Sequence, residues 1–600
     1  MDPATHAAPT ARWRRPRVTT GDATSAAERA DDPTGWAFGD SVVEGLEHVL
    51  RARRDIRRYR PDPVPGDHLA RVLAAGHAAP SVGHSQPWRF IVVTEPTTRE
   101  RAAAMADRER LRQAALLEPD RGRRLLDLQL EGIREAPVGI VVTCDRRAAA
   151  GGVLGRATFP DADLWSCACA IQNMWLMARG LGLGMGWVTL FDPVELASLM
   201  ILPDDVETMG WLCLGWPNER PPEPGLERHA WSKRAPLEDV VLRERWPSAD
   251  SPGPVPPESH LRAPSPARVV DVTDHADGML TPPGSLGVLD RAIDIVLAAG
   301  ATSPDGALIL VGADHPVVSL GVSAYRGETT REILAAAIAG EAMGVVTARA
   351  AGLSVFLVDA GLDGPLLDGA FSARPSGRRG NLRDADAMTR SDVDQLVQLG
   401  RSTGSAACPG GLVAVGEVGL GNTTVAAALC CALLTKPAAD VVGLGAGADT
   451  DMVQRKTAVV EAALARVRSE ARLSADDRLD AGDPLDVLAA LGGPEIAFLT
   501  GAILGAAESR ACIVLDGLAT SLAALIAARC EPGVRSYLIA GHLSREKSHA
   551  AVLVELGREP LLDLRLRAGE GVGAALAAGV LRNGLAVRLR TGRTRMEPRP

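Results

Sequence analysis

Short apolar runs recur along this chain, and in its first half they are separated by long helical patterns. RFIVVTE (89–95), VGIVVTCD (138–145) and MGWLCLGWP (209–217) have the length and composition of buried strands. Between them, residues 163–184 are apolar on most sides until Gly180, which predicts a buried or interfacial helix. The first block is therefore predicted to have an α+β fold.

The second half of the chain has a different pattern, in which Ala-rich helical stretches separate short apolar runs. This alternation predicts a parallel, Rossmann-like α/β sheet with helices on both faces. The predicted strands lie within 307–315, 355–363, 412–424, 441–449, 512–517 and 537–542. Ligands of such sheets bind outside the carboxyl ends of the strands. The polar residues at those ends are Asp314, His315, Asp359, Glu417, Asp516 and His542.

A Pro-, Ser- and Gly-rich segment at 247–267 has no periodic apolar pattern and predicts a linker. The chain of 600 residues is too long for one core, so two domains are expected, at 37–246 and 268–597. Residues 1–36 have basic residues without an apolar core behind them. They predict a disordered lead-in and not a secretory signal.

Composition excludes several classes of function. The net charge of −9 argues against nonspecific nucleic-acid binding. The nine cysteines show no metal-ligand spacing, so no metal is predicted. No apolar run reaches the roughly 18–20 residues of a membrane helix. We therefore predict a cytoplasmic protein that binds neither nucleic acid nor membranes.

The first block opens with RARRDIRRYR (51–60), in which six arginines surround one acid, Asp55. Together with AAPSVGHSQPWRF (78–90), this run resembles the nitroreductase-like flavoprotein family. Guanidinium groups suit the phosphate and the reduced ring of FMN through charge-assisted hydrogen bonds. The alternative is a solvated Arg-rich helix end. The resemblance implies FMN contacts from Arg53, Arg54, Arg57, Ser81, Gln86, Gly184, Gly186 and Arg234.

Asp55 stands where most nitroreductases carry Ser. With LEGIREAPVGIVVTCD (130–145), it resembles the 5,6-dimethylbenzimidazole synthase branch. That branch consumes reduced FMN with oxygen and releases dimethylbenzimidazole, the lower base of vitamin B12. The resemblance implies that Asp55 moves protons during this fragmentation. Thr189 keeps the hydroxyl of the branch's usual Ser and is a second candidate catalytic residue, whereas His84 and Ser85 depart from the branch pattern.

Three motifs of the second block resemble the nicotinate-nucleotide–dimethylbenzimidazole phosphoribosyltransferase family. They are TPPGSLGVLDR (281–291), EVGLGNTT (417–424) and RAGEGVGAAL (567–576). That family transfers phosphoribose from nicotinate mononucleotide to dimethylbenzimidazole, giving α-ribazole 5′-phosphate. The resemblance implies that Glu570 is the general base, because the attacking azole must lose its N–H proton. The alternative is a glutamate in a surface turn.

The glycine turn of EVGLGNTT ends a strand and opens an Ala-rich helix, whose N-terminus is a potential phosphate site. The chain has only four lysines, and Lys456 is one of them, at a position where the family also has lysine. Pro316 stands where the family has Gly, which leaves the loop shape after His315 in question. The implied substrate contacts are Glu417, Gly419, Gly421, Asn422, Thr423, Lys456, Asp314, His315 and Asp516.

The two resemblances are to consecutive steps of one pathway, so the sequence predicts a bifunctional enzyme for the lower ligand of B12. Its substrates would be reduced FMN, oxygen and nicotinate mononucleotide, with dimethylbenzimidazole passing between the steps. A separate flavin reductase and a homodimer are expected from the families. Two alternatives for the first block stay open: an NAD(P)H-dependent nitro- or quinone reductase, and a flavin-binding sensor fused to the transferase.

Overall fold

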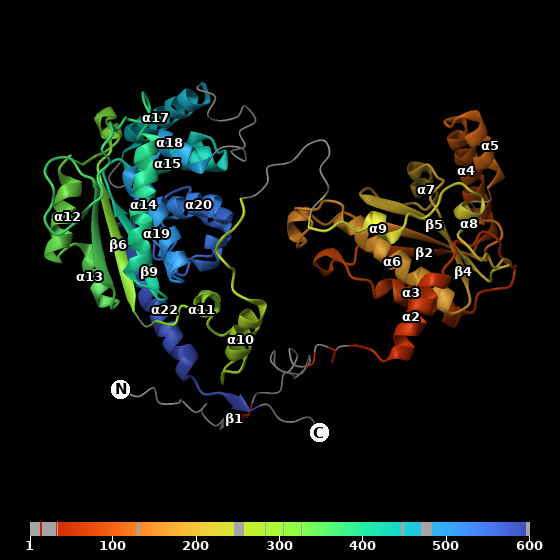
Figure 1. The fold of residues 1–600 in the computed structure, drawn as a ribbon. Helices are drawn as coiled ribbons and strands as arrows, with labels where there is room; N and C mark the ends of the chain where they lie inside the picture. Colours follow the sequence, from red (N-terminus) through yellow and green to blue (C-terminus); the bar gives the residue numbers. More distant parts are fainter. Residues whose placement is uncertain are drawn as a thin grey trace. The chain divides into compact units, whose positions relative to one another are not determined.

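The computed structural model divides the chain into two compact units, each with its own sheet and core (Figure 1). One unit is Trp36–Ser248, and the other consists of Met1–Gly35 with Ala249–Pro600. The residues described are 13–14, 32, 34–35, 37–128, 132–244, 246, 257–282, 284–303, 305–325, 327–445, 449–469 and 483–595.

An antiparallel four-stranded sheet forms the centre of the unit Trp36–Ser248, in the order β2-β3-β5-β4. Along β3, Ile140 and Val142 pack against the helices of one face, and Val141 packs against those of the other. This period of two is expected of a strand buried on both faces. The strands are β2 (Trp88–Val93), β3 (Val138–Asp145), β4 (Gly184–Val188) and β5 (Val206–Gly215).

Helices α3 and α6 cover one face of this sheet, and α4 and α7 cover the other. The predicted apolar helix is α6, which ends at Gly180 as expected, and the three predicted strands are confirmed. The helices of the unit are α2 (Asp40–Ala52), α3 (Gly66–His77), α4 (Pro96–Ala115), α5 (Pro119–Asp127), α6 (Ala162–Gly180), α7 (Pro193–Leu199), α8 (Gly225–Arg228) and α9 (Leu237–Val240), with short 3₁₀ turns η1 (Val82–His84) and η2 (Ala150–Gly152).

The second unit has the predicted parallel sheet, with six strands in the order β11-β10-β9-β6-β7-β8. Along β6, Ile309 and Val311 face one core, and Leu308 and Leu310 face the other. Figure 1 shows this sheet between two helical layers. The strands are β6 (Gly306–Ala313), β7 (Ser354–Gly361), β8 (Phe371–Ser372), β9 (Leu412–Val418), β10 (Cys512–Leu515) and β11 (Leu538–Ala540).

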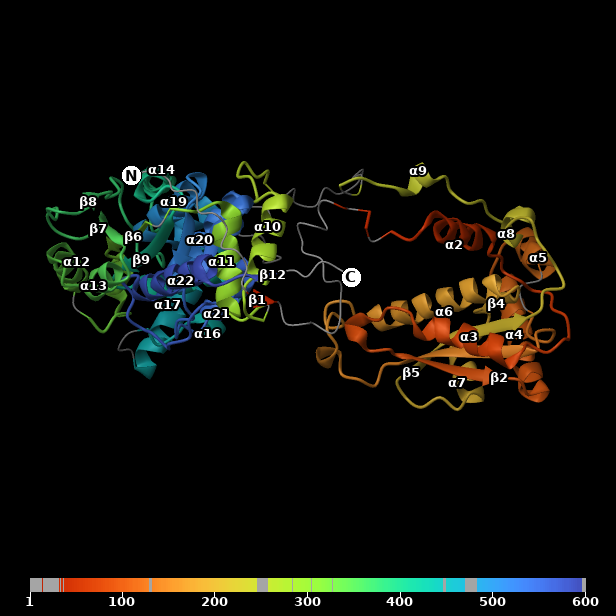
Figure 2. The ribbon, with the colours of Figure 1, turned by 90° about the horizontal axis from the view of Figure 1, so that it is seen from below.

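One helical layer contains α14, α15 and α18 to α20, and the other contains α11 to α13 and α22. The turned view of Figure 2 shows α11 and α22 close together, and side chains of both belong to the second of these cores. The helices and 3₁₀ turns are α10 (Pro266–Asp277), α11 (Val288–Ala299), η3 (Pro316–Leu320), α12 (Thr329–Ala339), α13 (Met343–Ala350), α14 (Arg390–Ala407), α15 (Asn422–Leu434), α16 (Ala438–Val441), α17 (Thr450–Ser469), α18 (Pro484–Leu491), α19 (Pro494–Glu508), α20 (Leu518–Cys530), η4 (Pro532–Tyr537), α21 (His549–Leu556) and α22 (Val572–Arg590).

The many small residues of this unit allow its helices to pack closely. A Cβ at Gly400 of α14 would lie 1.9 Å from the carbonyl oxygen of Phe498 in α19, and a Cβ at Gly505 would lie 1.9 Å from that of Arg401. Neither position can hold a side chain without moving a helix.

The predicted strand at 441–449 is wrong over its described part. Val441 ends α16, and residues 442–445 form no strand, while 446–448 lie outside the described residues. The carbonyl oxygen of Leu444 accepts a bond of 3.4 Å from Lys456 Nζ. The described part of this run is therefore a loop that accepts a hydrogen bond from a buried cation instead of joining the sheet.

Two segments differ from their predicted lack of structure. Trp13–Arg14 (β1) pairs in parallel with Thr594–Arg595 (β12), whereas most of the predicted lead-in lies outside the described residues. Within the predicted linker, the Ser259 hydroxyl and the His260 N–H donate to Glu531, and α10 begins at Pro266. Residues 247–256 lie outside the described part of the chain.

By length and composition, two helical segments of the described chain could span a membrane, Thr329–Ala350 and Val572–Arg590. The second is α22, which packs against β9 and β10 and contributes five buried residues to a core. A core helix passes the same test, so these segments are weak indications of membrane insertion.

Candidate active sites of the two units

A cavity of about 400 Å³ lies at the carboxyl ends of β9, β10 and β11 in the second unit. It contains most of the predicted substrate contacts, brought together from five separate parts of the chain. The predicted residues that line it are Glu417, Gly419, Gly421, Asn422, Thr423, Lys456, Asp516, His542 and Glu570.

The turn between β9 and α15 forms one wall of this cavity. Gly421 adopts φ +85°, and α15 begins at the next residue. Asn422 Nδ2 donates to both carboxylate oxygens of Glu417, at 2.9 and 2.8 Å. The turn therefore points a fixed carboxyl group and a helix N-terminus into the same space.

Glu417 is the carboxyl of this cavity with the most perturbed acidity. Burial raises the pKa of Glu417 to about 8, and the charge of Glu495 acts in the same direction. The bonds from Asn422 oppose this shift. At neutral pH most molecules therefore hold Glu417 as a neutral acid that can donate a hydrogen bond.

Glu570 lies beside Glu417 in the cavity wall, in a turn with left-handed backbone at φ +57°, and its N–H donates to the Glu417 carbonyl oxygen at 3.1 Å. Its Oε2 accepts a bond of 3.0 Å from the N–H of Gly344, at the start of α13. A Cβ at Gly344 would lie 2.1 Å from the Glu570 carbonyl oxygen, so this contact requires glycine. Glu570 is thus held at the cavity wall and is not a solvated surface glutamate.

Asp516 supports this turn. Its carboxylate accepts from the N–H groups of Gly571, at 3.2 Å, and Ala574, at 3.1 Å, at the start of α22. His542 Nε2 lies 3.3 Å from its Oδ1. These contacts direct the Asp516 carboxylate toward α22, so binding of ribose hydroxyls by Asp516 stays a prediction.

Lys456 is 4% exposed, although it lies on the long helix α17. Its Nζ lies 3.4 Å from Thr423 Oγ1 and 3.4 Å from the Leu444 carbonyl oxygen. Burial lowers the pKa of Lys456, and Glu546 opposes this effect. The interpretation of an exposed helical lysine is wrong, and the position fits a cation that meets an anionic substrate group.

Asp314, His315 and Asp359 do not line the cavity. Asp314 is buried and accepts from the N–H of Asp363, and Asp359 is paired with Arg374. Pro316 occupies the first position of η3, where its missing N–H costs no hydrogen bond. The loop after His315 therefore tolerates proline.

Sequence reasoning missed several residues of the cavity wall. Arg567 is the first residue of the motif RAGEGVGAAL (567–576). Its positive charge within this motif could have identified it as a candidate site residue. Arg545 and Glu546 lie in the loop that follows β11, which no local pattern marks as part of a site. The unpredicted polar residues are Ser323, Tyr325, Thr329, Thr330, Ser544, Arg545, Glu546 and Arg567.

In the first unit, the arginine-rich run forms a cationic cluster beside β4. Arg53 lies over the ring of Trp175, with 4.6 Å from its guanidinium carbon to the ring centroid. Burial lowers the pKa of Arg53, Asp55 opposes this effect, and the charges of Arg234 and Arg54 lower it further. Three guanidinium groups that repel one another favour an anion such as a phosphate.

Asp55 is fixed at the edge of this cluster. A β-bridge joins it to Met185, and its carboxylate accepts from Arg57, which also donates to the carbonyl oxygen of Trp187 at 3.0 Å. Burial raises the pKa of Asp55, and Arg57 opposes the shift. Its Oδ1 is buried and has no hydrogen-bond partner among the described residues.

The glycines of β4 serve packing in this structure. A Cβ at Gly186 would lie 2.4 Å from the Ile56 carbonyl oxygen, and a Cβ at Gly184 would lie 2.9 Å from the Ile56 side chain. Gly184 and Arg54 also line a cavity of about 630 Å³. Thr189 is exposed just beyond the end of β4. Close approach of the glycines to a flavin ring stays a prediction.

Ser81 and Gln86 are not brought to the arginine cluster. The N–H of Gln86 donates to Ser81 Oγ at 3.0 Å, and Gln86 lines a different cavity, of about 410 Å³, with Arg89 and Arg147. His84 and Gln86 both adopt positive φ, at +54° and +47°. The predicted flavin contacts thus form two separate groups within one chain.

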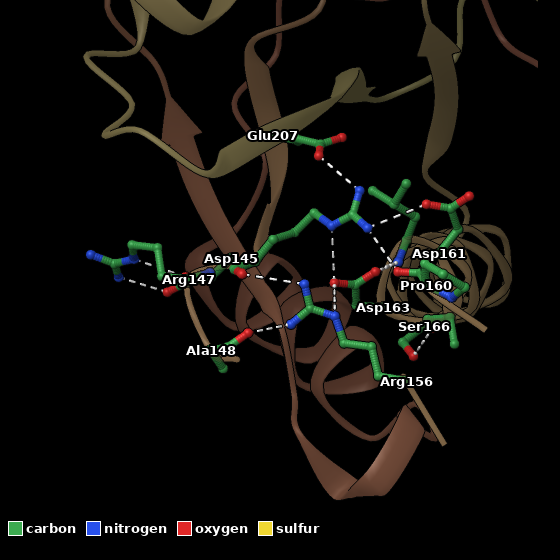
Figure 3. A network of polar contacts seen from close by, with 12 residues as sticks. Asp145, Arg147, Ala148, Arg156, Pro160, Asp161, Asp163, Ser166 and Glu207 are labelled. Carbon is green, nitrogen blue, oxygen red and sulfur yellow. Dashed lines mark hydrogen bonds and ion pairs between the residues drawn. The ribbon is translucent and has the colours of Figure 1, made fainter. Parts of the chain in front are cut away.

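A buried ion-pair network supports the second group (Figure 3). Asp163, at the start of α6, lies 3.1 Å from Arg156 Nε and 3.2 Å from Arg146 Nε. One turn later, Ser166 accepts from the N–H of Val82, next to Ser81. The network thus fixes the loop between β3 and α6 beneath the predicted flavin segment.

Among the described residues, no group of three or more His, Cys, Asp or Glu side chains is placed to hold a metal ion. The predicted absence of a metal is not tested by this finding and stays a prediction.

Two family models match the chain. The DBI_PRT model, described as phosphoribosyltransferase, matches residues 262–594, and the model of the nitroreductase family matches residues 50–216.

Curated and solved relatives match each part. A nicotinate-nucleotide–dimethylbenzimidazole phosphoribosyltransferase of Halalkalibacterium halodurans is 37% identical over 320 residues, covering 52% of this chain and 87% of the relative. A 5,6-dimethylbenzimidazole synthase of Rhodospirillum rubrum is 40% identical over 212 residues, covering 34% of this chain and 96% of the relative. The crystal structure of CobT from Thermus thermophilus is similar with a TM-score of 0.51 and 37% identity, covering 55% of this chain and 97% of that one.

Proposed function

The chain belongs to the DBI_PRT phosphoribosyltransferase family and, through its first unit, to the nitroreductase family, and on this premise we propose that it makes the lower ligand of vitamin B12 in two steps. The first unit breaks down reduced FMN with oxygen to 5,6-dimethylbenzimidazole. The second transfers phosphoribose from nicotinate mononucleotide to that base. The observation that carries the proposal is that one chain joins relatives whose names link the product of one step to the substrate of the next.

In the second unit, the proposed reaction is a displacement at C1′ of the ribose. One azole nitrogen forms the new bond to C1′, and the bond from C1′ to the pyridinium nitrogen breaks, with its electrons leaving on nicotinate. Glu570 accepts the proton of the azole N–H. This role is supported by the hydrogen bond from the Gly344 N–H, which holds the Glu570 carboxylate at the cavity wall.

Anion binding in this cavity is assigned to the α15 N-terminus and Lys456. The helix N-terminus supplies its partial positive charge, and the Lys456 ammonium lies within reach of Thr423. Glu417, neutral at physiological pH, donates a hydrogen bond to the substrate. The pair of Glu417 and Glu570 thus divides the acid and base roles.

In the first unit, the residues beside β4 fit reduced FMN as a substrate. Arg53, Arg54 and Arg234 would hold its phosphate, and Asp55 would hold or move a proton through its unbonded Oδ1. When bound, reduced FMN supplies the ring that is converted to the base. Oxygen is the proposed co-substrate, and a separate flavin reductase supplies the reduced flavin.

A homodimer is part of the proposal. Ser81 and Gln86 lie apart from the arginine cluster within one chain, so the same groups of a second copy could complete the flavin site. The apolar residues Val42, Leu46 and Leu50 of α2 are 54%, 56% and 49% exposed, which supports a partner surface there. A cytoplasmic location is also part of the proposal.

One experiment tests both steps. Purified protein, chemically reduced FMN and nicotinate mononucleotide are mixed in air, and mass spectrometry measures α-ribazole 5′-phosphate. We expect the product without added base. Product that forms only after dimethylbenzimidazole is added would leave the transferase in place and reassign the first unit as a reductase or a flavin-binding domain. Stable FMN cycling with NAD(P)H would favour the reductase.

A further inference from the structure

A buried imidazole–carboxylate pair lies behind the wall of the transferase cavity. His315 follows β6, Glu495 begins α19, and their Nε2 and Oε1 atoms are 3.2 Å apart. His315 is 6% exposed and Glu495 is 0% exposed. Burial of a carboxylate is costly unless a partner compensates it, and the imidazole is the group that the structure places beside Glu495.

Glycines leave room for this pair. A Cβ at Gly493 would lie 2.5 Å from His315 Cε1 and 2.5 Å from Glu495 Oε2. A Cβ at Gly419 would lie 3.4 Å from His315 Nε2, and one at Gly421 would lie 3.4 Å from His315 Cβ. Gly419 and Gly421 belong to the turn between Glu417 and Asn422. The imidazole therefore packs against the turn that fixes the position of Glu417.

The same pair acts electrostatically on Glu417. After burial itself, the charge of Glu495 is the largest cause of the raised pKa of Glu417. The charged groups that face Glu417 are Glu495, Asp516 and Glu546. Asp516 is occupied by α22 and His542, and Glu546 is balanced by Lys456. Glu495 is the member of this set that lies outside the cavity.

We propose that Glu495 and His315 are positioning residues of phosphoribosyl transfer. The imidazole supports the glycine turn, and the carboxylate keeps Glu417 in its protonated, hydrogen-bond-donating form. This inference rests on the function proposed for the second unit. Two buried carboxylates that cannot both ionise freely give one neutral acid, which leaves Glu570 as the base.

The test is the pH profile of transfer from nicotinate mononucleotide to added dimethylbenzimidazole by the full-length protein. In Glu495→Gln, we expect the fall of kcat/KM at high pH, the alkaline limb of the profile, to occur about one pH unit lower than in the wild type. The reason is that removal of a like charge lowers the pKa of Glu417. Glu495→Asp keeps the charge and should keep the limb near its wild-type position. An unmoved limb in Glu495→Gln would overturn the inference.

His315→Gln tests the pair from its other side. Loss of the imidazole leaves Glu495 buried without its partner and so favours its uncharged form. The alkaline limb should therefore move down, as in Glu495→Gln, and a limb that stays or moves up contradicts the proposal. The two substitutions are made at different residues of the pair, so if one variant does not fold, the other still decides the test. Glu508→Gln, on the same helix, is the matched control and should leave the profile unchanged. Wild-type protein that transfers nothing would instead reject the proposed function.

Discussion

Single carboxyl groups decide the chemistry proposed for both units, and their surroundings differ. Asp55 has one oxygen held by Arg57 and one without a partner among the described residues. Glu417 is held by Asn422 on both oxygens, and Glu570 is held by a backbone N–H. The residue types were visible in the sequence, but these partners decide which group gives a proton and which accepts one.

Asp55→Asn should abolish proton transfer in the first unit and leave flavin binding intact. The arginine cluster is untouched, so reduced FMN should still bind, while formation of dimethylbenzimidazole falls by about a hundredfold or more. Mass spectrometry of the product and a flavin-binding titration measure the two effects. If Asp55→Asn loses FMN binding and the wild-type protein forms no dimethylbenzimidazole, the flavin-sensor alternative is favoured. Base formation at the wild-type rate would remove Asp55 from the mechanism.

Glu417→Gln should change stability in a pH-dependent way. The folded-state pKa of about 8 lies above the ordinary glutamate value, so the folded state binds this proton more tightly than the unfolded state does. That contribution is fully present at low pH and is lost as the pH rises through about 8. We expect the variant to unfold several degrees above the wild type at about pH 9 and within error of it at about pH 5.

Thermal unfolding of both proteins at the two pH values measures this difference, with Glu332→Gln, an exposed carboxyl on α12, as the control. A variant that is equally stabilised at both pH values would mean that Glu417 does not titrate in the proposed range.

At the scale of elements, helix α2 has an apolar side that is exposed in the single chain. None of its residues is buried, yet its apolar residues recur on one side at helical spacing. The sequence predicted the arginines that follow this helix but gave no sign that the helix itself would stay exposed. Its exposure is understandable if the flavin site is shared between two copies.

Leu46→Glu should therefore weaken the dimer and lower formation of dimethylbenzimidazole at least tenfold, because it places a charge in a buried interface. Transfer to added base should be unchanged. Leu111→Glu is the matched control, since Leu111 of α4 is 59% exposed against 56% for Leu46. Sedimentation velocity measures the assembly. A fully dimeric and active Leu46→Glu protein would place the flavin-site contact elsewhere.

At the scale of the whole molecule, two units with separate cores share one chain. Each core buries its own sheet, so we expect two unfolding transitions in calorimetry. FMN should raise the midpoint temperature of one transition and nicotinate mononucleotide that of the other, because each ligand adds about 2.7 kcal/mol to the free energy of unfolding of its unit at a hundred times Kd. A single transition that both ligands shift would show that the units unfold as one.

The sequence by itself determined what depends on neighbouring residues. The other strand-forming runs, the buried helix α6 and the glycine turn before α15 were predicted correctly, because local pattern and turn chemistry fix them. The run at 441–449 was read wrongly, because an apolar glycine-rich segment can serve as a strand or as a loop.

The tertiary structure decided everything that depends on which distant segments meet. It buried Lys456 beside Thr423, brought Arg234 near Arg53, and separated Gln86 from that cluster. It also paired His315 with Glu495 across 180 positions of the chain. Such contacts arise from the packing of helices on a sheet, in which burial and charge act together, and no spacing along the chain encodes them.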